Sequence, residues 1–479
     1  MKIMHRGCNI MSNHKDIKRV LSKYSFYDRT HIQQYLEDMA AKGWMLEKIT
    51  SFYWQFKAIE PQALHFSVNY FPPASEFDAE PSEQLLTIRD YCAHAGWEFV
   101  TASAQMQIYC NAQDNPTPIE TDALVEVETI HKAMKKNFLP SQIVLLLLGI
   151  LQIGLQFNMF RINPINYFVV TSNFVAIFCW LAVMILCCTE IFGYLRWYKK
   201  ARHAAEVDGE FINTPSYRHI LLSLLTIVLM VFVLWVLTLH NREMYMIVGT
   251  LILTFIFIFW FTGFVMKQLK RRKVSAKVSR IATVAISFAC GFLLVVGIVF
   301  GTIQISNTGI FAEEPRYDTY VYQGHEFHVY NDELPLYIED LMETDYTEYS
   351  TYWEGRESFL LAKYEGFQRP RMDALGEPSL RYDVYYIKWG ALYDLCVNEL
   401  VHKYDDWYDE DVPEEWRDTF RAVDSKLWNA KTVYQKYTGD TPSEQYILCY
   451  DDIIVELTPG FELTNAQKLI ISEKLSQQK

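Results

Sequence analysis

The stretch that decides the class of this protein runs from Met244 to Met266 and reads MYMIVGTLILTFIFIFWFTGFVM, without one charged residue. A helix needs roughly 20 apolar residues to cross the ~30 Å hydrocarbon core of a bilayer. The stretch therefore predicts a transmembrane helix.

Four further apolar stretches lie on either side of it. The five predicted spans together form a transmembrane region over 139–305, and they run approximately over 139–160, 167–194, 220–239, 244–266 and 281–305. The first is the least apolar, because it contains Gln142, Gln152 and Gln156. Glutamines inside spans usually hydrogen-bond to neighbouring helices. We expect a membrane protein with five transmembrane helices.

Lys and Arg residues are concentrated in alternate loops. The segment before span one, the loop between spans two and three and the loop between spans four and five hold 15 of them, whereas the two other loops hold one Arg each. Loops rich in Lys and Arg stay in the cytoplasm. The distribution predicts a multi-pass protein of the cell membrane with a cytoplasmic N-terminus and an extracellular C-terminus.

Charge divides the chain in the same way. Residues 304–479 contain 35 acidic and 16 basic residues, whereas residues 1–303 contain 22 acidic and 28 basic residues. Such asymmetry is typical of parts that lie in different surroundings. We therefore expect a disordered leader over 1–23, a cytoplasmic α+β domain over 24–138, the transmembrane region, and an acidic extracytoplasmic α+β domain over 306–479.

The cytoplasmic domain contains an internal repeat. The segment HIQQYLEDMAAKG runs into WMLEKITSFYWQF, and SEQLLTIRDYCAHAG runs into WEFVTASAQMQIYC. A shift of 53 residues places Gly43 on Gly96 and Trp44 on Trp97. This pattern predicts a helix that ends at a left-handed glycine and a strand that begins at the tryptophan. We expect one antiparallel sheet with two helices on one face.

These residues resemble a known family. The segment YLEDMAAKGWMLEKI, the second Gly-Trp unit and the tail NAQDNPTPIETDALVEVETIHKAMKKN are similar to the family known as domain of unknown function 2812, over residues 25–138. The resemblance implies a Gram-positive bacterial membrane protein that carries this domain before several spans and is often encoded beside PadR-type regulators. Residues 1–23 extend beyond the usual start of the family. The family assigns no catalytic residues, so it implies none here.

The extracytoplasmic domain offers few sites for chemistry. Cys396 and Cys449 are the only cysteines after the last span, and they predict a disulfide if the domain is exported and the two approach each other. His325 and His328 point to opposite faces of one strand, which disfavours metal chelation. The acidic run over 405–415 attracts Ca²⁺ or a cationic peptide in one interpretation, and a solvated loop is favoured.

Two alternatives concern the cytoplasmic side. The segment KQLKRRKVSAKVSR, residues 267–280, is a site for anionic lipid or nucleic acid in one interpretation, but anchoring at the inner leaflet explains it with no further assumption. Aromatic residues of the domain line a ligand pocket in one interpretation and form its core in the favoured one. They are Tyr53, Trp54, Phe56, Phe66, Tyr70 and Phe71.

No P-loop, dinucleotide-binding or hydrolase motif is present. We predict no enzyme activity, no catalytic residue, no cofactor or metal, and no nucleic-acid partner. The favoured hypothesis is a sensor or regulatory component that lies in the lipid bilayer and binds a protein partner through its cytoplasmic domain. An accessory subunit of a transport or export system is the alternative, and an envelope-facing enzyme using Asp405, Asp406 and Asp409 is the third.

Overall fold

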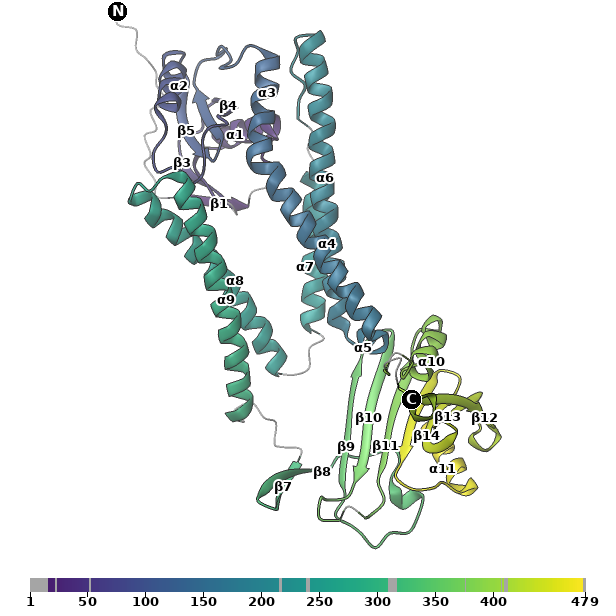
Figure 1. Ribbon diagram of the computed structural model, residues 1–479. Helices are drawn as coiled ribbons and strands as arrows, with labels where there is room; N and C mark the ends of the chain where they lie inside the picture. Colours follow the sequence, from purple (N-terminus) through teal and green to yellow (C-terminus); the bar gives the residue numbers. More distant parts are fainter. Residues whose placement is uncertain are drawn as a thin grey trace, which may run out of the picture. The chain divides into compact units, whose positions relative to one another are not determined.

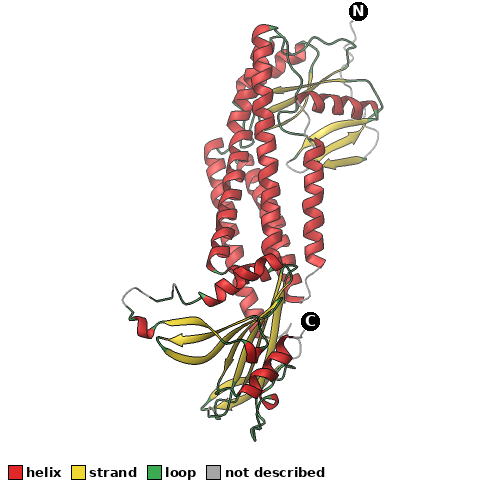
Figure 2. Ribbon diagram, turned by 90° about the vertical axis from the view of Figure 1, so that its right-hand side faces the viewer, coloured by secondary structure: helices red, strands yellow, loops and turns green. Residues whose placement is uncertain are grey.

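The computed structural model describes residues 16–476 apart from 22–23, 51–52, 215–217, 238–241, 309–316, 375, 406 and 409–411. The chain forms two compact units. Unit 1 contains residues 1–152 and 178–308, and unit 2 contains residues 153–177 and 309–479. Figure 2 shows that both units contain strands and helices.

Long helices occupy the region that the sequence predicts to cross the membrane. They are α4 (Leu139–Ile162), α6 (Thr171–Val207), α7 (Arg218–Leu237), α8 (Arg242–Arg271) and α9 (Ala276–Thr308) (Figure 1). Among the described residues, four helical segments are long and apolar enough to span a bilayer: 123–162, 171–207, 248–271 and 276–294.

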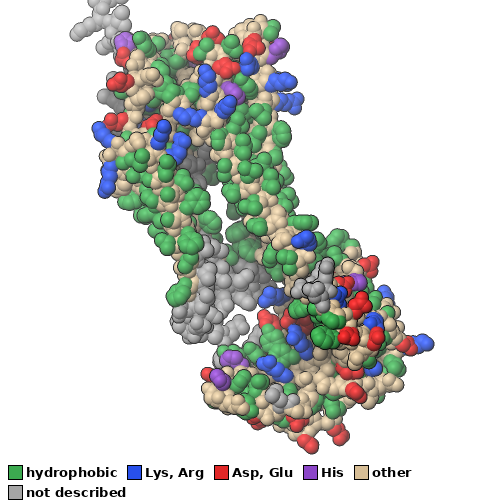
Figure 3. Space-filling view, viewed as in Figure 1, with side chains coloured by type: hydrophobic (Ala, Val, Ile, Leu, Met, Phe, Trp, Pro, Cys, Tyr) green, Lys and Arg blue, Asp and Glu red, His purple; other side chains and the backbone are tan. Residues whose placement is uncertain are grey.

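The remaining predicted span, 220–239, falls on α7. Its described apolar part, Ser223–Leu237, is shorter than the other four segments, and residues 238–239 lie outside the described part of the chain. The class of membrane protein with α+β regions therefore holds, with four candidate spans among the described residues, and the fifth span stays a prediction. Figure 3 shows hydrophobic side chains along these helices, as lipid contact requires.

The soluble part of unit 1 contains two three-stranded antiparallel sheets, so the expectation of one sheet was wrong. Their orders are β1-β3-β2 and β4-β6-β5. Each repeat supplies a helix and a hairpin, and a different third strand completes each sheet. The elements are β1 (Ile17–Leu21), α1 (Arg29–Ala41), β2 (Trp44–Ile49), β3 (Tyr53–Ala58), β4 (His65–Tyr70), α2 (Glu83–His94), β5 (Glu98–Ser103) and β6 (Met106–Asn111).

The internal repeat extends to backbone detail. Gly43 and Gly96 have φ of +82° and +86°, in the left-handed region that favours glycine. The register of β2 against β3 shifts between Leu46 and Lys48, and that of β5 against β6 shifts between Phe99 and Thr101. These two irregularities are separated by the same 53 residues as the glycines. The duplication is therefore one of fold as well as of sequence.

The expectation of a disordered leader over 1–23 does not hold for residues 17–21. They form β1, which pairs with β3 from Ile17 opposite Lys57 to Leu21 opposite Tyr53. Val20 packs against the core while its strand neighbours stay exposed. An edge strand can form here because β3 presents an unpaired row of backbone groups. Residues 1–15 lie outside the described part of the chain.

The soluble part of unit 1 shares its core with the helices that follow it. Helix α3 (Ala123–Ala133) continues through a π-helical turn (Met134–Phe138) into α4. Tyr27, which is fully buried, packs against Phe138, Tyr194 and Trp197. Tyr194 and Trp197 belong to α6, and Leu139 of α4 packs against the same buried cluster, so two long helices contribute to one core.

Aromatic side chains of these sheets lie in the same core. Trp54, Phe56, Phe66 and Tyr70 are all at most 7% exposed. Packing, the favoured interpretation, accounts for their position.

Unit 2 is built on a seven-stranded antiparallel sheet of order β12-β13-β14-β15-β11-β10-β9, beside a separate β7-β8 hairpin. Helix α11 (Asn465–Ser476) packs on one face of this sheet, and α10 (Tyr393–Val401) packs on the other. The strands are β7 (Tyr317–Tyr322), β8 (His325–Tyr330), β9 (Ser350–Glu357), β10 (Leu361–Arg369), β11 (Leu380–Ile387), β12 (Asp418–Val423), β13 (Thr432–Thr438), β14 (Thr441–Cys449) and β15 (Ile453–Pro459).

A short helix between α4 and α6 completes the core of unit 2. It is α5 (Pro164–Val169), whose Ile165 and Val169 are 4% and 3% exposed against the α10 face of the sheet. The hydroxyl of Ser358 donates a hydrogen bond of 2.6 Å to the carbonyl of Phe168. The link between two long helices is thus part of a soluble core.

Candidate functional site

Four carboxylates face one another across the sheet of unit 2. Glu365 lies directly opposite Glu354 of β9 and opposite Asp383 of β11, and Asp383 lies directly opposite Glu456 of β15. Like charges at directly opposed positions destabilise a sheet. We call these four residues the acidic ladder. An arrangement that costs stability and persists is a candidate functional site.

The ladder occupies the part of one sheet face that helices leave open. Alternate residues of a strand share a face, so Leu361, Lys363 and Glu365 lie in line along β10. Leu361 is fully buried in the core with α5 and α10, whereas Lys363 is partly exposed and Glu365 is exposed. Along β11, Tyr385 and Asp383 repeat the change from apolar to charged. The acidic ladder therefore begins where α5 and α10 no longer cover this face of the sheet.

Lys363 neutralises the centre of the ladder. Its Nζ lies 2.6 Å from Oε1 of Glu365 and 3.4 Å from Oδ2 of Asp383. The bond to Lys363 holds the pKa of Glu365 below its usual value. Among the described residues, Asp383 has one further cation, Arg381, whose Nε is 4.0 Å from Oδ1.

Asp383 remains the strained member of the ladder. It is 8% exposed, and its Oδ1 atom accepts no hydrogen bond from the described residues. Burial raises its pKa, and the nearby carboxylates of Glu365 and Glu456 act in the same direction against Lys363. The charged form of this carboxyl is therefore under-solvated.

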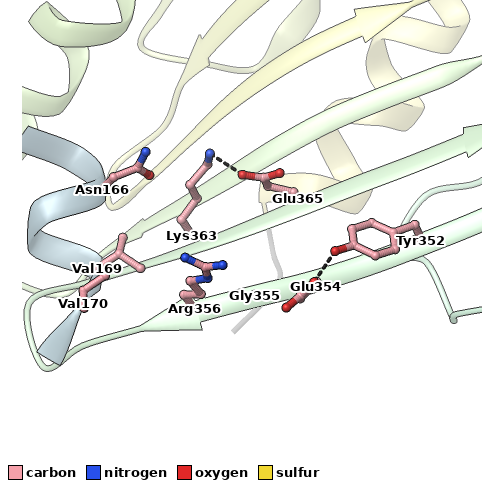
Figure 4. Close-up of a pocket in the computed structure, with 9 residues that line it drawn as sticks. All are labelled: Asn166, Val169, Val170, Tyr352, Glu354, Gly355, Arg356, Lys363 and Glu365. Carbon is pink, nitrogen blue, oxygen red and sulfur yellow. Dashed lines mark hydrogen bonds and ion pairs between the residues drawn. The ribbon is translucent and has the colours of Figure 1, made fainter. Parts of the chain in front are cut away.

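The ladder lines two pockets. Around Glu354 and Glu365, a pocket of about 250 Å³ lies between strands β9 and β10 and the residues of α5. In Figure 4, Lys363 reaches toward Glu365, Tyr352 bonds to Glu354, and Arg356 lies between them and Val169. The full lining is Asn166, Val169, Val170, Tyr352, Glu354, Gly355, Arg356, Lys363 and Glu365.

The second pocket, of about 350 Å³, lies around Asp383 and Glu456. Lys403 pairs with Glu456, and the amide of Gln445 donates to the same carboxylate at 2.9 Å. Arg381 and Thr458 complete the lining. Both pockets thus present carboxylates beside cationic groups, which suits a ligand that carries an amine together with an anionic or hydroxyl group. Among the described residues, no cluster of three side chains is arranged to hold a metal ion.

A different polar cluster joins α1 of unit 1 to other elements of that unit. Asp28, 2% exposed, accepts a hydrogen bond of 2.8 Å from the hydroxyl of Thr214, and its Oδ1 lies 2.6 Å from Nδ1 of His31. Arg29 forms an ion pair with Glu126 of α3. We call these five residues the polar hub.

The charges of the polar hub are strongly desolvated. Burial raises the pKa of Asp28, and the hydrogen bonds from His31 and Thr214 oppose that rise. Burial also lowers the pKa of Arg29. Nearby, the hydroxyl of Ser25 donates to both carboxylate oxygens of Glu190 at 2.7 Å. The loop before α1 is therefore fixed to α3, to α6 and to the segment after α6.

Four of the five hub residues and both Gly-Trp repeats lie in a segment that matches a known family model. Residues 28–141 match the family model described as Protein of unknown function (DUF2812). Over these residues the chain resembles the DUF2812 family. The comparisons with curated proteins and with solved structures gave no match. The match extends from Asp28 of the polar hub to the first residues of α4, and we call residues 28–141 the DUF2812 region.

The two Gly-Trp units of the DUF2812 region serve packing. Trp97 is 4% exposed, and its Nε1 donates to the carbonyl of Thr117 at 2.8 Å. Trp44 is partly buried against the main core. The backbone N–H groups of Gly43 and Gly96 bond to the carbonyls of Ala40 and Ala93 and end the helices.

The cysteines expected to pair lie in one core of unit 2. Cys396 of α10 is fully buried and Cys449 of β14 is 3% exposed, and both are free thiols in the structure. Burial raises their pKa values to about 12 and about 11. Their disulfide stays a prediction, and non-reducing peptide mapping of the purified protein would test it.

The other polar features of unit 2 lie apart from the ladder. His325 and His328 are both exposed on β8, and His328 packs on Tyr317. Within the acidic run over 405–415, residues 406 and 409–411 lie outside the described part of the chain. Sequence reasoning missed the ladder because its four acids are spread over more than one hundred residues. The only local signal is one acid in each of three strands rich in apolar residues.

Proposed function

We propose that this protein is a non-enzymatic sensor or regulatory component of the cell membrane of a Gram-positive bacterium. In this proposal the acidic ladder binds a ligand outside the cell, and the DUF2812 region binds a protein partner in the cytoplasm. Five helices, α4 and α6–α9, cross the bilayer, with the N-terminus inside and the C-terminus outside. The bias of 15 Lys and Arg against two supports this orientation.

One observation carries the proposal: the hairpin α4-α5-α6 contributes to a soluble core at each end. Its α5 link supplies Ile165 and Val169 to the core of unit 2. Its other end supplies Phe138, Tyr194 and Trp197 to the core of unit 1. Between these ends the two helices pack closely, since a Cβ on Gly149 would lie 2.7 Å from the side chain of Met184.

Such a hairpin gives a physical route for a signal. Packed cores are bistable and do not deform continuously, so a shift of α5 is transmitted along two helices that cannot change length. A ligand acts through them only if it binds the two arrangements with different affinity. The ladder pocket beside α5 meets this condition, because Asn166 and Val169 form part of its lining.

A partner surface is available on the DUF2812 region. Helix α2 exposes three apolar side chains: Leu86 is 51% exposed, Ile88 40% and Tyr91 72%. Aromatic and aliphatic residues exposed together are typical of protein interfaces. The opposite helix of the repeat, α1, exposes mainly polar residues such as Gln34 and Asp38.

Affinity purification of the full-length protein in mild detergent, followed by mass spectrometry, tests the proposal. We expect a cytoplasmic regulator to be retained by the wild type and lost from Leu86→Glu/Tyr91→Glu. The matched control Gln34→Glu/Ala41→Glu places the same charges on exposed positions of α1 and should retain it. Recovery of a transport ATPase would favour the accessory-subunit alternative, and recovery of the same proteins by both variants would exclude α2 as the interface.

A further inference from the structure

A cavity in unit 1 lies where the basic end of α8 meets the DUF2812 region. Its volume is about 640 Å³, and it does not involve the ladder or the polar hub. Its walls are formed by the end of β2, the loop before α2, the turn between β5 and β6, and the last turns of α8. Figure 3 shows Lys and Arg side chains gathered where these helices meet the soluble part of unit 1.

Four cationic groups of this cavity have no carboxylate partner in the described part of the chain, and one of them is Lys48 at the end of β2. Lys267 and Lys270 project from the last turns of α8, and Arg89 comes from α2. No ion pair involving any of the four is found among the described residues, although Lys273 three residues further on pairs with Glu80 at 2.8 Å.

Arg89 is held in place without being neutralised. Its guanidinium packs 3.6 Å from the ring centroid of Phe99, and its Nη2 donates to Oε1 of Gln107 at 2.7 Å. Its Nε is buried and donates no hydrogen bond to a described residue. This guanidinium is partly buried and has no carboxylate beside it in the described part of the chain, which favours an anion in the cavity.

Two of the three carboxylates that line the cavity already have a bonding partner. Glu80 pairs with Lys273, and Oδ2 of Asp78 accepts from the backbone N–H of Ser75 at 2.7 Å. Glu76 is the one lining carboxylate without such a contact in the described residues. The balance in the cavity therefore favours binding of an anion.

The position of the cavity along α8 indicates what carries that anion. Gly263 and Met266 line it on the apolar side, one turn before the lysines, and Trp260 and Phe264 nearby are 63% and 44% exposed. A Cβ on Gly263 would meet nothing within 4 Å, so there is open space beside the helix. One wall thus changes from apolar to basic within a single helical turn, as the boundary between acyl chain and headgroup does.

We infer that this cavity binds the phosphate of an anionic phospholipid, with Lys267, Lys270 and Arg89 around the headgroup and an acyl chain beside Gly263. This site does not depend on the proposed function. A specific lipid site differs from the general attraction of basic residues to an anionic membrane. General attraction requires no particular lysine and no residue of α2.

Native mass spectrometry of the full-length protein in detergent tests the inference, with phosphatidylglycerol and phosphatidylcholine as probes. We expect phosphatidylglycerol to remain bound at concentrations where phosphatidylcholine does not. Lys267→Gln/Lys270→Gln should weaken its binding roughly 30-fold, because each cation near an anionic headgroup contributes about fivefold. The control Arg271→Gln/Arg272→Gln removes the same charge from exposed positions that do not line the cavity, and it should weaken binding much less than the lysine variant.

The second variant, Arg89→Gln, lies outside the membrane segment and separates the site from anchoring. Weaker phosphatidylglycerol binding by this variant, with an unchanged elution volume in size-exclusion chromatography, supports the site. Equal losses in the two double variants, or undiminished binding by Arg89→Gln, would overturn it. Displacement of the lipid by millimolar inorganic phosphate would assign the cavity to a soluble phosphate ligand and would also overturn the lipid assignment.

Discussion

The polar hub of unit 1 and the acidic ladder of unit 2 both place ionisable groups in desolvated surroundings, but they treat charge in opposite ways. In the hub each carboxylate is paired with a cation or a hydroxyl: Asp28 with His31 and Thr214, and Glu126 with Arg29. In the ladder carboxylates face carboxylates, with Lys363 shared between Glu365 and Asp383. The difference teaches that burial alone does not identify a binding site. Opposite charges that pair with each other hold a fold, whereas like charges that face one another beside a pocket are available to a ligand.

The largest effect is expected when the hub loses a partner. Arg29→Ala leaves Glu126 charged without its cation, and the two side chains are only 14% and 11% exposed. Removing one member of a buried pair costs about 3 kcal/mol or more. We expect a marked fall in the midpoint of thermal unfolding of the full-length protein in detergent.

The control for this change is Arg202→Ala, because Arg202 forms ion pairs with Glu128 and Glu206 while 51% exposed. Solvent screens exposed ion pairs, so their loss changes stability little. An equal shift in both variants would show that the hub is no more than a surface ion pair, and the contrast with the ladder would fail.

The next effect concerns the two left-handed glycines of the DUF2812 region. Gly43→Ala should destabilise by about 2 kcal/mol and Gly96→Ala by about 1 kcal/mol, since left-handed backbone costs roughly 1–2 kcal/mol for a residue with a Cβ. Gly43 is the worse site, because its Cβ would lie 2.9 Å from the backbone carbonyl oxygen of Ile59.

At Gly96 the nearest atoms belong to the side chains of Gln113 and Asn111, at 3.1 and 3.2 Å, and these can move. Comparing the unfolding midpoints of the two variants checks the order. If Gly96→Ala lowers the midpoint more than Gly43→Ala does, the order predicted from the distances around each Cβ is wrong. The two repeats would then differ in packing although their glycines have similar φ angles.

These glycines also mark how far the sequence predicts the structure. The repeat, its left-handed glycines and the apolar spans follow from spacing within a few residues, so they can be predicted. The division of the strands into two sheets depends on which third strand joins each hairpin, a contact between β4 and β6 separated by more than 30 residues. The ladder depends on register among β9, β10, β11 and β15, which no local pattern specifies. The cavity beside Lys267 likewise requires Arg89, far earlier in the chain.

A smaller effect, of opposite sign, is expected in the ladder. Asp383→Asn should stabilise unit 2 by up to about 1 kcal/mol at neutral pH, since it removes a charge that opposes two others. The pKa of Asp383 is raised from its ordinary value of 3.8, so the folded state binds the proton more tightly than the unfolded state. Its contribution to stability is therefore complete below pH 3.8 and is lost as pH rises through the folded pKa.

Denaturant unfolding of wild type and Asp383→Asn at several pH values checks this sign. The advantage of the variant should shrink as the pH falls through the raised folded pKa, and it should be smallest below pH 3.8, where the wild-type carboxyl is mostly protonated in both states. A variant that is less stable at neutral pH would mean that Lys363 and Arg381 fully compensate Asp383, and the ladder would then resemble the hub.

The smallest effect, and the most specific to the ladder, is the coupling between its two central acids. Glu365→Gln alone should destabilise by about 0.5 kcal/mol, because it loses the charged bond to Lys363 but also relieves repulsion from Asp383. In the Asp383→Asn background that repulsion is already absent, so the same change should cost more. A double-mutant cycle isolates this difference, and like charges in contact predict a coupling of about 0.5 kcal/mol or more. Additive effects would mean that Lys363 screens the two carboxylates from each other. In that case the strained charge resides on Asp383 alone, and the pocket around Asp383 and Glu456 becomes the more favourable place for a cationic ligand.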